Sequence, residues 1–140
     1  MKERALPCLV VQRYHGVPKW IYDECTALAR FLERGFCPNH AVCVWLCPAP
    51  AITAPDGQVG FGTFSVNDGR YPEIHIACDW RDWQRQDGLN KGDSKMLILT
   101  TLAHEWHHYE QWRDGKPMSH RGMERRVRTL MDEFFLSWED

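Results

Sequence analysis

The sequence lacks the long apolar run that a membrane-spanning helix would need. Such a helix requires about 18 to 20 consecutive apolar residues. Near the N-terminus only the short stretch Ala5–Val11 is apolar, and Pro7 interrupts it, so it does not resemble a signal peptide. We therefore expect a cytoplasmic protein with no membrane partner.

A strong charge of one sign is also missing. The formal net charge is −2, from 17 Lys and Arg residues against 19 Asp and Glu residues. A large basic excess is what draws a protein to nucleic acid or to anionic lipid. Neither is expected as a partner here. The arginines at 121, 125, 126 and 128 are interpreted as the solvated side of a terminal helix.

Size and composition favour one packed domain covering residues 1–140. The chain is 44% hydrophobic and has seven tryptophans, and a domain of this length buries about two-thirds of its unfolded surface. Without a secretion signal, we expect the six cysteines to be reduced. Cys37, His40, Cys43 and Cys47 do not have the spacing of a common zinc finger, so buried free thiols are expected there.

Apolar periodicity predicts three helices and three strands in an α+β fold. The predicted fold is a small three-stranded, mostly antiparallel sheet packed against an N-terminal helix, a central helix and a C-terminal helix. The expected helices are Pro18–Phe36, Asp93–Gly115 and Ser119–Trp138, and the expected strands are Ala41–Leu46, Gln58–Val66 and Tyr71–Ala77. A polar connection, Asp79–Gly92, leads into the central helix.

The central helix contains the pattern H-E-x-x-H, in which His104 and His108 are the outer histidines. On a helix, side chains four residues apart lie on one face, where two imidazoles can bind one Zn²⁺. Glu105 then reaches the water on the open side of the metal and is the predicted general base. His107 is one turn from His104, but using it as a ligand would displace Glu105 from that position. We therefore predict His104 and His108 as metal ligands.

Catalytic zinc usually takes a third protein ligand, which must come from outside this pattern. Glu124 and His120 are the main candidates, because Glu110 and Asp114 lie too close along the same helix and His75 is a lone histidine. If the last helix folds back antiparallel after Gly115, a rise of about 1.5 Å per residue brings Glu124 level with His108. This argument favours Glu124 and keeps His120 as the alternative.

The chain resembles the gluzincin metallopeptidases, which combine H-E-x-x-H with a following helix that bears a glutamate, here Glu124-Arg-Arg-Val127. Its short form is similar to the minigluzincins and to the ImmA/IrrE-like peptidases of phage and mobile elements. The resemblance implies zinc bound by His104, His108 and Glu124, with Glu105 as base. It also implies that strand Glu73–Ala77 is an edge that aligns an extended peptide. The segment Ser119–Gly122 resembles SprT-like proteases, whose third ligand is a histidine.

The sequence thus predicts a zinc-dependent metallopeptidase, in which zinc lowers the pKa of its bound water and Glu105 accepts the proton. The expected partner is a peptide or protein substrate. Two alternatives stay open: a non-catalytic, zinc-stabilised protein-binding module, and a DNA-associated SprT-like protease. The candidates for stabilising the oxyanion are His120, His75, Tyr109 and Tyr71.

Overall fold

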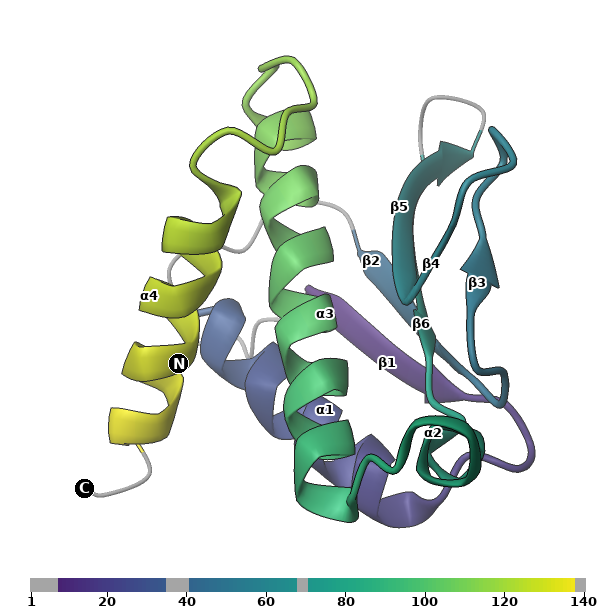
Figure 1. Ribbon diagram of the computed structural model, residues 1–140. Helices are drawn as coiled ribbons and strands as arrows, with labels where there is room; N and C mark the ends of the chain where they lie inside the picture. Colours follow the sequence, from purple (N-terminus) through teal and green to yellow (C-terminus); the bar gives the residue numbers. More distant parts are fainter. Residues whose placement is uncertain (1–7, 35–40, 68–70, 138–140) are drawn as a thin grey trace, which may run out of the picture.

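The computed structural model describes residues 8–34, 41–67 and 71–137 and contains four helices and six strands within those ranges. Figure 1 shows their arrangement. The strands are β1 (Leu9–Arg13), β2 (Val42–Cys47), β3 (Ile52–Thr53), β4 (Val59–Gly60), β5 (Gly62–Asn67) and β6 (Tyr71–Ala77). The helices are α1 (Lys19–Leu32), α2 (Trp80–Asp87), α3 (Lys91–Arg113) and α4 (Met123–Ser137).

The main sheet has four strands in the order β1-β2-β6-β5, and β3 and β4 form a separate two-stranded hairpin. Strands β1, β2 and β6 run parallel, and only β5 is antiparallel to its neighbour β6. The α+β class is confirmed. The prediction of a three-stranded, mostly antiparallel sheet is wrong, because the chain crosses over from β1 through α1 to a parallel β2, as parallel strands require.

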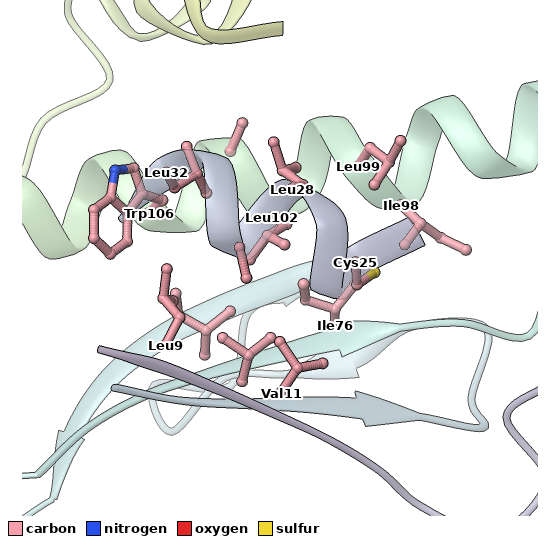
Figure 2. Packing of buried hydrophobic residues seen from close by; sticks show 14 of the residues in the cluster. Leu9, Val11, Cys25, Leu28, Leu32, Ile76, Ile98, Leu99, Leu102 and Trp106 are labelled. Atoms are coloured by element: carbon pink, nitrogen blue, oxygen red, sulfur yellow. The ribbon is translucent and has the colours of Figure 1, made fainter. Parts of the chain in front are cut away.

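Helices α1 and α3 contact the sheet, and α4 packs on α3 (Figure 1). Parallel strands β2 and β6 alternate between fully buried and half-buried residues, and their buried side faces the helices. Figure 2 shows this core, in which Leu9, Val11 and Ile76 from the strands meet Leu28 of α1 and Leu102 of α3. The sheet and α1 thus hold α3, which carries the H-E-x-x-H pattern, along much of its length.

The helix ends follow local capping chemistry. The Asn90 side chain caps α3 by accepting a hydrogen bond from the Asp93 N–H, so the helix begins slightly earlier than predicted. Asp79 caps α2 in the same way, and Gly88 ends it in the left-handed conformation. The connection predicted over residues 79–92 therefore contains a helix. The last helix starts at Met123 rather than at Ser119.

Some predicted features lie partly outside the described residues. These are the last residues of the helix expected over Pro18–Phe36, the final residue of the helix expected over Ser119–Trp138, and Cys37 and His40 of the cysteine-rich stretch. Cys43 and Cys47, which the structure does describe, are half-buried free thiols on β2. In the part of the chain that is described, no helix has both the length and the apolar character needed to cross a bilayer.

Candidate metal site

The second half of α3 brings the two outer histidines of the motif together, as the helical spacing predicts. His104 and His108 are both half-buried, and their ring centroids lie 5.0 Å apart. Both rings line a cleft together with residues 62–66 of β5. Because α3 is held by the core described above, the positions of both rings are set by a buried helix.

The third imidazole comes from the loop between α3 and α4. His120 is exposed, and its Nε2 lies 3.3 Å from Nε2 of His108. Its ring centroid is 5.3 Å from that of His104. One ligand atom from each of the three histidines lies within 4.8 Å of the others, so this group could hold a metal ion.

The electrostatics of the site favour neutral imidazoles. Burial, reinforced by the neighbouring histidines, lowers the pKa of His104 to about 4. Burial also lowers the pKa of His108, although the hydrogen bond to Gln111 acts in the opposite direction. At neutral pH both rings therefore have the deprotonated nitrogen that a metal requires.

Glu105 lies beside these rings and is only 6% exposed. Burial raises the pKa of its carboxyl to about 7. The backbone of β5 comes very close here, since a Cβ added to Gly62 would lie 2.5 Å from Cγ2 of Thr101 and 3.3 Å from Cγ of Glu105. A glycine at this position is what lets the strand approach the helix at the buried carboxylate.

A cleft of about 450 Å³ opens over the site. One wall contains His104, Glu105, His108 and His120, and the facing wall consists of the β3–β4 hairpin and residues 62–66 of β5. Val59 and Met118 are exposed apolar residues on its lining, at 70% and 49%. The strand that borders the histidines along this cleft is therefore β5.

The segment Glu73–Ala77 is not an edge of the sheet, so that prediction is wrong. This segment is β6, which pairs with β2 on one side and with β5 on the other. The cause is the parallel pairing of β6 with β2, which inserts β6 between β2 and β5. Strand β1, which the sequence analysis did not assign, extends the sheet beyond β2, and β5 is the strand at the opposite end, beside the cleft.

The favoured third ligand, Glu124, is not brought to the histidines. Its side chain is 89% exposed and its Oε1 accepts a hydrogen bond from Arg128 at 3.1 Å. Because α4 begins only at Met123, Glu124 falls in the first turn of the helix instead of level with His108. The residue that joins His104 and His108 is His120, the alternative candidate.

The remaining sequence candidates lie elsewhere. The His107 Nδ1 is 3.2 Å from Glu110 Oε1, and Glu110 also binds Arg126, so His107 belongs to a polar cluster facing α4. Tyr109 is fully buried in the core. His75 lies on β6, 3.9 Å from Glu73, and Tyr71 is 59% exposed at the start of that strand. Among the four oxyanion candidates, only His120 lines the cleft.

Gln111 is a site residue that the sequence analysis missed. Its side chain is 8% exposed and contacts His108 and the backbone of Ser119. The available signal was its position three residues after His108, which places both on one helix face. Glutamine is not a usual zinc ligand, so the sequence alone did not predict a role for it at the metal site.

A scan against protein-family models, a search of curated proteins and a search of solved structures each found no match. The chemistry of the site is therefore the only basis for a functional conclusion.

Proposed function

We propose that this protein is a zinc-dependent peptidase, with His104, His108 and His120 as the metal ligands and Glu105 as the general base. A single observation carries the proposal: three imidazoles converge beside a buried carboxylate in an open cleft. Structural zinc sites usually enclose the metal with four protein ligands, whereas catalytic sites use three and leave one position open.

The donor set fits zinc. Neutral imidazole nitrogen is a preferred ligand of Zn²⁺, and the depressed pKa values of His104 and His108 keep both rings available near neutral pH. When bound, zinc would act as a Lewis acid on water and on the scissile carbonyl. Other divalent metals also accept imidazole, so the choice of zinc rests on the three-histidine set beside a glutamate.

Glu105 supplies the proton transfers. A group that first takes a proton and then returns it to the leaving amine works best with a pKa near the operating pH. Burial places the pKa of Glu105 at about 7, well above that of an ordinary glutamate. Its position next to His104 in the sequence and in the cleft wall supports this role, because the carboxylate would then lie beside a bound metal.

The edge of β5 is the proposed substrate-binding strand. Within the described part of the chain β5 pairs only with β6, and residues 62–66 line the cleft. An extended peptide can add to such an edge through backbone hydrogen bonds, which gives affinity with little dependence on sequence. The exposed side chains of Val59 and Met118 would favour apolar substrate residues near the metal.

The decisive experiment replaces Glu105 with glutamine and measures both zinc content and cleavage of a broad library of quenched peptides. We expect zinc to stay bound and cleavage to fall by about 100-fold or more, because general-base catalysis contributes about 10² to 10⁴ in rate. Glu133→Gln on α4, which makes the same chemical change at an exposed position, is the matched control.

Two outcomes would overturn the proposal. If Glu105→Gln cleaves peptides as fast as the wild-type protein, Glu105 is not the general base. A wild-type protein that binds zinc yet cleaves no peptide in the library would instead be a zinc-stabilised binding module.

A further inference from the structure

Gln111 connects two of the three histidines through one buried amide. Its Oε1 lies 3.0 Å from Nδ1 of His108. The same oxygen accepts a hydrogen bond from the Ser119 N–H at 3.3 Å, and its Nε2 donates to the Ser119 carbonyl at 2.9 Å. Ser119 directly precedes His120 in the sequence. One side chain thus contacts a ring on α3 and the backbone next to the ring on the loop.

The contact with His108 determines which ring nitrogen is free. An amide oxygen is only an acceptor, so the Nδ1 facing it must carry the proton. The lone pair of His108 is then on Nε2, the nitrogen that points toward His120. Partners of this kind fix the tautomer and the orientation of metal-binding histidines.

The contact with Ser119 fixes the loop. The segment between Asp114 and Met123 is largely exposed, including Met118 and His120. A loop with so little buried surface would otherwise be free to move. The paired hydrogen bonds between Gln111 and the Ser119 backbone, which are partly buried, attach the loop to the end of α3.

We propose that Gln111 is a positioning residue that sets His108 and His120 relative to each other and so preorganises the metal site before the ion arrives. This inference rests on the proposed metal ligands of the previous section, but it does not depend on peptidase activity. Gln111 then raises the metal affinity by positioning both His108 on α3 and His120 in the loop.

The test measures the zinc affinity of Gln111→Met by competition with a chromogenic chelator. Methionine keeps the length of the side chain and its fit to the helix but removes all three hydrogen bonds. We expect the affinity to fall by about 10- to 100-fold, the usual effect of losing such a partner. The matched control is Gln86→Met, the same change at an exposed position of α2. An affinity of Gln111→Met within twofold of wild type would overturn the proposal.

A double-mutant cycle with His120→Ala tests the connection to the loop. If Gln111 positions His120, the fold-change caused by Gln111→Met should shrink when His120 is already absent. An equal fold-change in both backgrounds would show that Gln111 acts through His108 alone.

A second variant, Gln111→Glu, keeps the acceptor for His108 and loses the donor to Ser119, so it should recover part of the affinity that Gln111→Met loses. A complete lack of recovery would show that the contact with His108 does not affect the metal affinity and would overturn that half of the proposal.

A measurement on the wild-type protein avoids any folding defect in the variants. Nitrogen-15 NMR of the zinc-loaded protein reports the tautomer of each histidine. We expect His108 to carry its proton on Nδ1. A proton on Nε2 would overturn the role of Gln111, whereas an absence of peptide cleavage would overturn only the proposed function.

Discussion

At the scale of single residues, the identity of the third ligand depends on where the last helix starts. Glu124 and His120 are separated by one helical turn in the sequence, but the structure places His120 in the loop and Glu124 in the first turn of α4. His120 then lies against His108 while Glu124 faces solvent beside Arg128. A shift of a few residues in a helix boundary thus exchanges the two roles.

The choice between His120 and Glu124 as third ligand gives the first prediction. His120→Ala should lower zinc affinity by at least about 100-fold, because it removes one of three donors, whereas Glu124→Ala should change it by less than about twofold. The exposed ion pair between Glu124 and Arg128 contributes at most about 1 kcal/mol to stability. Zinc titrations of the two variants check the prediction, and the reverse order of effects would restore Glu124 as the ligand.

Gly62 gives the second prediction. A methyl group there would overlap Cγ2 of Thr101 and press on Cγ of Glu105. We expect Gly62→Ala to destabilise the protein by about 1–3 kcal/mol, the usual cost of overpacking, and to impair catalysis more than zinc binding. Gly60→Ala, where an added Cβ meets only a backbone oxygen at 3.9 Å, is the control. Equal stability and activity of the two variants would contradict this account.

At the scale of elements, the sequence predicted α3 and the pairing of His104 with His108 because both depend on local spacing. It missed β1, since the five residues Leu9–Arg13 are too few for a clear periodic signal. It also missed the parallel arrangement, because the pairing of Leu9 with Val42 joins strands that are distant in the sequence. Local patterns do not contain such pairings.

The buried thiols of Cys25 and Cys78 give the third prediction. Burial raises the pKa of Cys78, at the end of β6, to about 12 and also raises the pKa of Cys25 in α1. A raised thiol pKa means that the reactive thiolate is scarce below that pH in the folded protein. At pH 8 we expect iodoacetamide to leave both cysteines unmodified until denaturant is added. Mass spectrometry of labelled peptides checks this, and rapid labelling of the native protein would contradict it.

The same shift has a consequence for stability. For Cys78 the folded pKa lies above the unfolded value of about 8.5, so the stability that this thiol contributes is fully present below pH 8.5 and decreases as pH rises toward 12. The free energy of unfolding should therefore decline in the alkaline range. Cys78→Ala, compared across pH, should show a smaller alkaline decline than the wild-type protein.

At the scale of the whole molecule, the proposed ion would join α3 to the loop that leads into α4. Helix α4 contacts α3 far more than it contacts the sheet (Figure 1). A ligand that binds the folded state stabilises it by about 2.7 kcal/mol when present at 100 times its dissociation constant. The stability of the whole chain should therefore depend on metal.

Removal of metal gives the fourth prediction. We expect a chelator to lower the midpoint of thermal unfolding by about 5–10 °C for a domain of this size, and added zinc to restore it. In His120→Ala the unfolding midpoints with chelator and with zinc should differ much less than in the wild-type protein. Scanning calorimetry with and without chelator measures the effect, and an unchanged midpoint in the wild-type protein would contradict a bound ion.

The three histidines also lie close together along the chain, with His120 only 12 residues after His108. Closing so short a loop costs little conformational entropy, so zinc could gather the same side chains in a chain that has not yet folded. An ion bound that early would act as a nucleus for the hairpin of α3 and α4. Zinc would then raise the rate of folding as well as the stability of the folded chain.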